Sequence, residues 1–121
     1  MNSVTTSRQK NKTNIYYDTS LLTELDIYLI KEGNHHRLYE KMGAHPLSRK
    51  GQEGTHFSVW APNAERVSVK GGFNNWQSDS HPLKPRSDES GIWEGFVPGV
   101  ADGETYKYYI DFAAEYRLDY I

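Results

Sequence analysis

The stretch FNNW, residues 73–76, places a tryptophan directly after two asparagines. Asn-Asn is typical of a tight turn, because asparagine adopts left-handed backbone conformations more readily than most residues. A turn lies at the surface, where a large apolar side chain is rarely found without a partner. Two interpretations of Trp76 therefore stay open at this point: the indole folds back under the turn into the core, or it is displayed to meet something flat and apolar.

The residues around Trp76 favour display and indicate the chemistry of its partner. Its neighbours are all neutral amides or hydroxyls: Asn74, Asn75, Gln77 and Ser78. Lys107, further along the chain, is expected on the water-facing side of a strand. Together these groups suit a sugar, because a pyranose has an apolar C–H face that stacks on an indole and a rim of hydroxyls that hydrogen-bonds to amides and amines. The candidate carbohydrate-binding residues are Trp76, Lys107, Asn74 and Asn75.

No spacing of residues predicts catalysis or a metal site. The acidic residues expected in loops are Asp79, Asp88, Glu89 and Asp102. A glycosidase-type mechanism needs two carboxylates held across a cleft, and nothing selects such a pair, so solvated loop acids are the better interpretation. His35 and His36 are adjacent rather than four residues apart as in helical zinc sites, and the chain has no glycine motif for phosphate. We therefore expect no catalytic residue, no metal and no cofactor.

The length and charge of the chain argue against several classes of protein. Its 121 residues form one ordinary domain at most, whereas a (β/α)8 catalytic barrel needs roughly 250 residues. The net charge of −2 gives no reason to expect nucleic acid or an anionic membrane as a partner. Cysteine is absent, no apolar run approaches the roughly 18 residues of a membrane span, and no secretory signal opens the chain. Residues 1–17 are expected to be a disordered leader, and the cytoplasm is the expected location.

A helical arm is predicted over residues 18–46. It opens with a helix at 18–33, which Gly33 ends. Three residues can cap the start of this helix: Asp18, Thr19 or Ser20. Its apolar residues recur at three- and four-residue spacing and form one stripe, made of Leu21, Leu22, Leu25, Tyr28 and Leu29. A short helical turn at 37–42 and an extended exit at His45-Pro46 complete the arm.

From Thr55 onward, apolar residues alternate with polar ones, which indicates β-strands. Strands are expected at 55–62, 66–73, 91–99, 104–112 and 115–120. The positions expected to face inward are Phe57, Val59, Val67, Val69, Tyr106, Tyr108 and Ile110. The opposite face is expected to carry His56, Ser58, Trp60, Ser68, Lys70, Lys107, Tyr109 and Asp111. Short strands separated by turn residues predict an antiparallel β-sandwich over residues 47–121, with Trp93 in its core. A bend is expected at Gly71 and Gly72.

Several stretches resemble a known family. GTHFSVWAPNAERVSVKGGFNNW, HPL, SGIWEGFVPG and GETYKYYID are similar to the family-48 carbohydrate-binding module, an immunoglobulin-like domain of glycogen- and starch-active proteins. The upstream stretch LLTELDIYLIKEGNHHRLYEKMGAHP resembles the region just before that module in bacterial 1,4-α-glucan branching enzymes. Together the resemblance covers about residues 19–112. It implies an all-β, immunoglobulin-like sandwich that binds α-glucans such as glycogen and precedes a (β/α)8 catalytic barrel whose motifs this chain lacks.

The resemblance also implies roles for individual residues. Glucan-binding members use the Trp of the FNNW turn and the Lys of the YK strand, which correspond to Trp76 and Lys107. Asn74 and Asn75 match the turn itself, where they shape the loop as much as they touch ligand. Some members carry a second tryptophan soon after the YK strand, but here that place holds Ala113-Ala114.

Three functional interpretations stay open. The first is a non-catalytic, glucan-binding module of a branching enzyme that acts in glycogen biosynthesis. The second is a structural docking domain, which places the helical arm and Trp60 against the catalytic barrel and binds little or no sugar. The third is a free-standing glycogen-binding protein. Because the chain ends at Ile121, within or just after an apparent strand, we expect that a further segment once followed it.

Overall fold

The computed structural model describes residues 15–35 and 37–112. The helical elements are α2 (Glu24–Glu32), the 3-10 turn η1 (Leu38–Glu40) and the 3-10 turn η2 (Gly72–Asn74). The strands are β1 (Gly43–Arg49), β2 (Gln52–Trp60), β3 (Ala64–Gly71), β4 (Lys84–Pro85), β5 (Ile92–Pro98) and β6 (Tyr106–Phe112). The strand expected at 115–120 lies outside the described residues.

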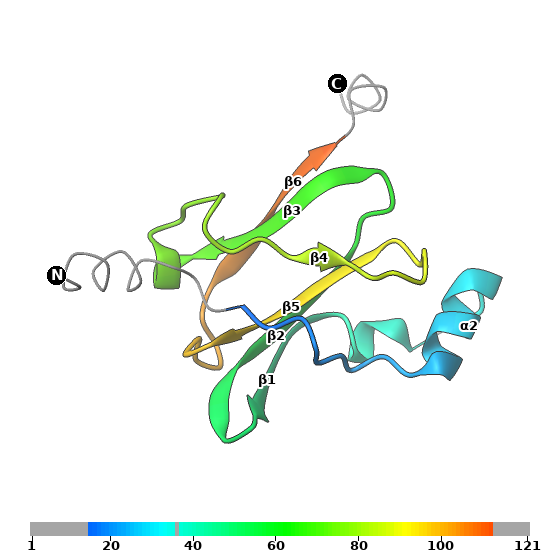
Figure 1. Ribbon diagram of the computed structural model, residues 1–121, viewed down its shortest axis with the longest axis horizontal. Helices are drawn as coiled ribbons and strands as arrows, with labels where there is room; N and C mark the ends of the chain where they lie inside the picture. The colour runs from blue at the N-terminus through cyan, green and yellow to red at the C-terminus, as the bar shows by residue number, and fades with distance from the viewer. Residues whose placement is uncertain (1–14, 36, 113–121) are drawn as a thin grey trace, which may run out of the picture.

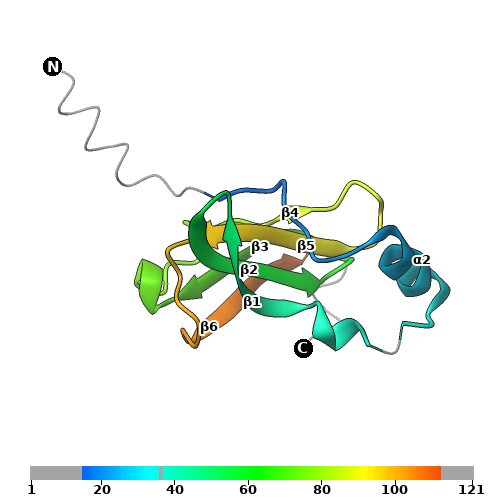
Figure 2. The same cartoon turned by 90° about the horizontal axis from the view of Figure 1, so that it is seen from below.

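The strands form two antiparallel sheets that pack face to face (Figures 1 and 2). The larger sheet has the order β1-β2-β5-β4, and the smaller sheet pairs β3 with β6. The α2 helix lies at one end of the long axis of the molecule, and η2, which opens the FNNW turn, lies at the other end in both views. The predicted all-β, immunoglobulin-like sandwich with a short helical arm is confirmed.

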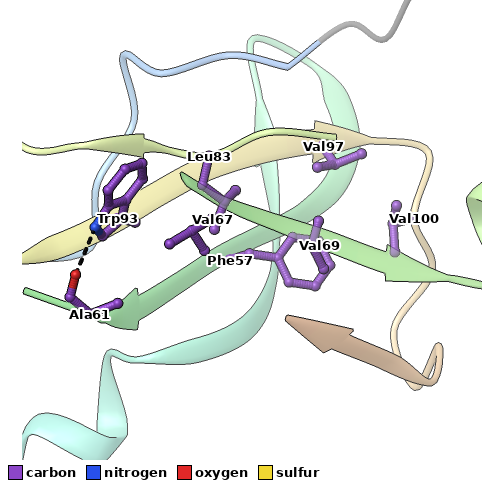
Figure 3. Close-up of a cluster of buried hydrophobic side chains, with 8 residues drawn as sticks. All are labelled: Phe57, Ala61, Val67, Val69, Leu83, Trp93, Val97 and Val100. Carbon is purple, nitrogen blue, oxygen red and sulfur yellow. Dashed lines mark hydrogen bonds between the residues drawn. The ribbon is translucent and has the colours of Figure 1, made fainter. Parts of the chain in front are cut away.

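The core lies between the two sheets (Figure 3). The alternation of apolar and polar residues predicted the members of this core correctly. Phe57, Val67 and Val69 are essentially inaccessible to water. Trp93 belongs to the same cluster, as expected, and its indole Nε1 donates to the Ala61 carbonyl at 3.0 Å. The remaining buried members of this cluster are Ala61, Leu83, Val97 and Val100. The sandwich therefore has one continuous core that does not require Trp76.

The β1 strand was not expected from the sequence. Residues 43–46, which the sequence places in the arm, form its first half, and β1 pairs with β2 from Gly43↔Ser58 to Arg49↔Gln52. Its sequence GAHPLSR shows no clear apolar alternation, so the period-two signal is missing. Pro46 is compatible with this strand because β1 is the edge of its sheet and needs fewer donors.

The α2 helix is shorter than predicted. It begins at Glu24, and Thr23 caps it through a reciprocal pair of hydrogen bonds with Asp26, so the caps expected at residues 18–20 are wrong. Gly33 ends the helix as expected, with φ at 75°. The predicted apolar stripe is also wrong, since Leu25 and Tyr28 are 64% and 60% exposed.

A different set of apolar residues attaches α2 to the sandwich. Ile27 packs with Leu22 and with Ile92 of β5, and these three side chains are buried. Partly buried Ile30, Leu38 and Met42 surround them. The helix is only nine residues long, and it packs on the sheet through Ile27 while Leu25 and Tyr28 stay exposed.

The arm covers the outer face of the larger sheet. His56 and Ser58 were placed on the face opposite the core, and they do lie there, but both are buried. The backbone carbonyl of Thr19 lies 3.1 Å from His56 Nε2, and the Ser58 hydroxyl donates to the Lys41 carbonyl. The sheet is therefore covered on both faces over its middle strands.

Glu94 joins the arm to this face. Its carboxylate accepts hydrogen bonds from the Ser20 hydroxyl at 2.9 Å and from Arg86 Nη1 at 2.8 Å. Burial acts to raise the pKa of Glu94, but contacts with His56, Ser20 and the Arg86 charge outweigh burial and hold the pKa below its usual range. Glu94 is thus charged and paired although it is buried.

Candidate functional site

The FNNW turn is built by left-handed backbone at two consecutive residues. Asn75 has φ at 56°, as the Asn-Asn pair predicted, and Trp76 has φ at 59°. A bulky side chain is uncommon in this region and its backbone is strained there. The Trp76 amide donates to the Gly71 carbonyl at 2.9 Å, which closes the turn against the end of β3. The surrounding structure holds this strained backbone in place.

Asn74 holds this turn together. Its side-chain oxygen accepts from the Gly71 amide at 2.9 Å. Its side-chain nitrogen lies within hydrogen-bond distance of several acceptors: Val69 O, Gln77 O, Ser80 Oγ and His81 Nδ1. Both polar groups of the Asn74 amide therefore face the protein, which leaves this side chain as an organiser of the loop.

The turn also packs tightly against the rest of the sandwich. A Cβ atom added at Gly71 would lie 2.6 Å from the Thr105 carbonyl and 2.9 Å from the Phe73 ring, so only glycine fits there. Phe73 stacks on Phe57 of the core and meets His81 edge to face, with ring centroids 5.2 Å apart. The bend expected at Gly71 and Gly72 is observed, and its cause at Gly71 is close approach of the neighbouring loop.

Trp76 lines a surface groove of about 700 Å³. The indole is 43% exposed, so it is neither buried in the core nor fully in water. Apolar Leu83 and Trp93 line the same groove, and its polar lining includes Gln77 and Ser78. An aromatic wall with amide and hydroxyl groups nearby is the combination that a sugar ring uses.

The outer face of β3 lies beneath this loop. Ser68 was expected in water but is only 6% exposed, because its hydroxyl donates to the Ser78 carbonyl and the segment after Trp76 folds over it. The Val69 amide donates to the His81 carbonyl at 3.0 Å, and the Leu83 amide donates to the Val67 carbonyl at 2.8 Å. Residues 81–83 therefore run along the edge of β3 that faces away from β6.

Lys107 lies on the outer face of the smaller sheet. It is exposed, whereas Tyr106 and Tyr108 pack against the core, so the predicted alternation along β6 is correct. Lys107 pairs with Lys70, the residue just before Gly71. This register brings Lys107 to the end of the sheet that carries the FNNW turn. Neither Lys107 nor the two asparagines line the groove of Trp76.

Tyr109 and Arg66 also line the groove and were not among the candidates drawn from the sequence. Tyr109 lies on β6 and is 40% exposed, and Arg66 lies on β3 and forms an ion pair with Asp111. The strand alternation already placed Tyr109 on the face of Lys107. The missing information was the position of the groove, which depends on how residues 76–79 fold over β3.

The described residues show no arrangement for metal binding or for membrane crossing. Within 15–35 and 37–112, no group of three His, Asp or Glu side chains is placed to hold a metal ion. In the same part of the chain, no helix is long and apolar enough to span a membrane.

Comparison with protein families matches residues 41–119 to carbohydrate-binding module 48, also described as the isoamylase N-terminal domain. The chain belongs to this family. The module is 61% identical over 85 residues to the 1,4-alpha-glucan branching enzyme GlgB of Synechococcus sp. (strain JA-3-3Ab), and the match covers 70% of this chain and 11% of that protein. The resemblance seen in the sequence is confirmed.

Two further relatives carry the same name. The module is 56% identical over 91 residues to GlgB of Aromatoleum aromaticum (strain DSM 19018 / LMG 30748 / EbN1), over 75% of this chain and 14% of the relative. It is 56% identical over 90 residues to GlgB of Rhizobium meliloti (strain 1021), over 74% of this chain and 12% of the relative. The chain therefore spans only a small part of the length of the relatives it matches.

Proposed function

We propose that this chain is the glucan-binding module of a 1,4-α-glucan branching enzyme that acts in glycogen biosynthesis in the cytoplasm. The observation that carries the proposal is the strained, half-exposed Trp76, which the FNNW turn presents at the wall of a groove. The core of the sandwich is complete without this indole, so its position is best explained by a ligand. The relatives are branching enzymes by name, which supports an α-glucan as that ligand.

Each candidate residue has a distinct role in this proposal. Trp76 stacks on the apolar face of a glucose ring, and Lys107 donates hydrogen bonds to hydroxyls of the same chain. Asn75 lies exposed at the turn and contacts the sugar edge, whereas Asn74 acts by holding the turn in shape. No chemical step is assigned to the module. Catalysis belongs to a barrel domain of the longer parent protein, and neither nucleic acid nor a membrane is a partner.

Co-sedimentation with glycogen tests the proposal. Trp76→Ala is expected to lose binding while the protein keeps the unfolding midpoint of a folded sandwich. Trp60→Ala is a matched control, because Trp60 is 59% exposed at the far end of β2. Unchanged binding of a folded Trp76→Ala protein would contradict the proposal. Loss in both variants would also contradict it, since the effect would then not be specific to the groove.

A second candidate function is docking onto the catalytic barrel. The observation that favours it is a set of large apolar side chains exposed far from Trp76: Leu25, Tyr28, Tyr39 and Trp60. Trp60 pairs with Ile92, against which Ile27 of α2 packs, so the arm and the end of β2 are neighbours. Large exposed apolar patches usually mark interaction sites. If docking is the main role, Trp76→Ala leaves glycogen binding unchanged, while Tyr28→Gln weakens the association with a separately produced barrel domain.

A further inference from the structure

We propose that Tyr109 is a second stacking platform, so that one α-glucan chain is held at two glucose rings, on Trp76 and on Tyr109. This inference rests on the proposed function and deepens it. Its starting point is that Tyr109 and Trp76 line the same groove, although they are far apart in the sequence.

Tyr109 has no role in the core. Its neighbours on β6, Tyr108 and Ile110, pack against the buried cluster, whereas Tyr109 points to the outer face and is 40% exposed. An exposed tyrosine offers an apolar ring and a hydroxyl that donates and accepts, which are the two features that a sugar contacts.

A small residue, Ser68, lies between Tyr109 and the loop that follows Trp76. Tyr109 pairs across the two strands with Ser68, which is smaller than its outer-face neighbours Arg66 and Lys70 on β3. The Ser68 hydroxyl is bonded to the Ser78 carbonyl, which draws it toward the loop that follows Trp76. The strand position between the tyrosine and that loop therefore carries no large side chain, and Ser68 lines the same groove as Tyr109.

Two cationic side chains border Tyr109 on β3. Lys70 holds its Nζ 5.8 Å from the centre of the Tyr109 ring, and Arg66 lies on the other side, paired with Asp111. Both residues face the same side of the sheet as Tyr109, since the register places them two residues on either side of Ser68. Ammonium and guanidinium groups donate to sugar hydroxyls, so a ring stacked on Tyr109 has hydrogen-bond donors at its edge.

Two platforms make binding depend on the length of the glucan. In this proposal a disaccharide occupies the Trp76 platform alone, whereas a longer chain contacts both rings. Removal of Tyr109 is therefore expected to weaken binding of maltoheptaose about three- to tenfold, which is the usual worth of one aromatic contact, and to leave binding of maltose unchanged. Removal of Trp76 is expected to weaken binding of both sugars.

The test uses the 121-residue chain and NMR titration of its backbone amides with maltose and with maltoheptaose. The variants are Tyr109→Thr, which keeps a good strand former, and Tyr109→Phe, which keeps the ring. Tyr39→Thr is the control, because Tyr39 is 74% exposed on the arm. The expected result is a loss confined to Tyr109→Thr and to maltoheptaose, with Tyr109→Phe within about twofold of the wild type.

Three outcomes would overturn the inference. If Tyr109→Thr binds maltoheptaose like the wild type while Trp76→Ala loses it, the module has one platform and the proposed function stands. If Tyr109→Thr weakens both sugars equally, Tyr109 does not act as a separate platform. If the wild type shows no saturable shifts with either sugar, the proposed function itself fails and the inference fails with it.

Discussion

The side-chain nitrogen of Asn74 lies 2.9 Å from Nδ1 of His81 and joins the FNNW turn to the segment that returns along β3. The Asn74 nitrogen is a donor, so Nδ1 of His81 must accept, and the ring is then neutral with its proton on Nε2. The His81 carbonyl also accepts from Val69, and its ring packs on Phe73. Through these contacts His81 holds the FNNW turn in a fixed position on β3.

We predict that protonation of His81 makes the module less stable in mild acid. Burial lowers the pKa of His81 below its ordinary value of 6.5. At pH values between 6.5 and the lower pKa of His81 in the folded protein, the unfolded chain binds more protons than the folded protein does. The stabilisation is therefore complete at neutral pH, and it decreases as the pH falls through this range. Urea unfolding between about pH 7.5 and about pH 5.5 measures the effect.

His81→Asn is the control for this pH dependence. An asparagine keeps an acceptor for Asn74 and does not titrate in the window. The wild type is expected to lose more free energy of unfolding than His81→Asn as the pH falls. Parallel pH profiles for the two proteins would show that the imidazole is not responsible.

A second prediction concerns Asn74 itself. Asn74→Ala removes the acceptor of the Gly71 amide and the donor to His81, and it is expected to lower the free energy of unfolding by about 1–3 kcal/mol. Asn75→Gly is the matched variant, because glycine adopts the left-handed backbone of Asn75 without strain, and its change is expected to stay within about 0.5 kcal/mol. Urea unfolding of both proteins gives the comparison. Equal effects would mean that backbone conformation and not the Asn74 amide determines the stability of the turn.

The sheet could be predicted from the sequence because its signal is local. Alternation along β3 and β6 placed Val67, Val69 and Tyr108 toward the core, and the structure agrees. The Asn-Asn pair likewise predicted left-handed backbone at Asn75. Each of these inferences needs only the residue type and its immediate neighbours.

The errors arose where distant segments meet. His56 and Ser68 are polar residues on outward strand positions, and both are buried because the arm covers one and the loop after Trp76 covers the other. The predicted cap of α2 was wrong at Ser20, a good capping residue, because the Ser20 hydroxyl donates to Glu94 of β5 instead. The groove beside Tyr109 was missed for the same reason. Such partners are fixed by tertiary contacts, which propensities and spacing do not report.

A third prediction tests the ionic attachment of the arm. Glu94→Gln keeps the shape of the side chain but removes the charge that pairs with Arg86, and a loss of about 1–3 kcal/mol in the free energy of unfolding is expected because the arginine is left without its buried partner. Glu40→Gln is the control, since Arg37–Glu40 is an exposed pair whose loss is expected to cost at most about 0.5 kcal/mol.

The carboxylates of Glu94 and Asp26 make the helical arm sensitive to strong acid. Burial acts to raise the pKa of Asp26, but hydrogen bonds from Lys41, Thr23 and His35 outweigh it, and its pKa, like that of Glu94, lies below its usual range. A carboxyl group whose pKa is lower in the folded protein than in the unfolded chain stabilises the fold at pH values above about 4. This stabilisation is lost as the pH falls through the pKa of the folded protein. Glu94→Gln is expected to show a smaller loss of stability than the wild type between about pH 5 and about pH 3. An identical acid transition in both proteins would exclude Glu94 as a cause.

The last prediction separates the two faces of α2. Ile27 is buried against Leu22 and Ile92, so Ile27→Ala is expected to lower the free energy of unfolding by about 2–4 kcal/mol through lost contacts and a residual cavity. Leu25 is 64% exposed two residues earlier, and Leu25→Ala is expected to change stability by less than about 0.5 kcal/mol. Both variants keep a good helix former, so helix propensity cannot explain a difference between them. Thermal and urea unfolding provide the measurement. Comparable losses for the two variants would mean that Leu25 is covered in solution, which would in turn favour self-association of the arm as the reason for its exposed apolar residues.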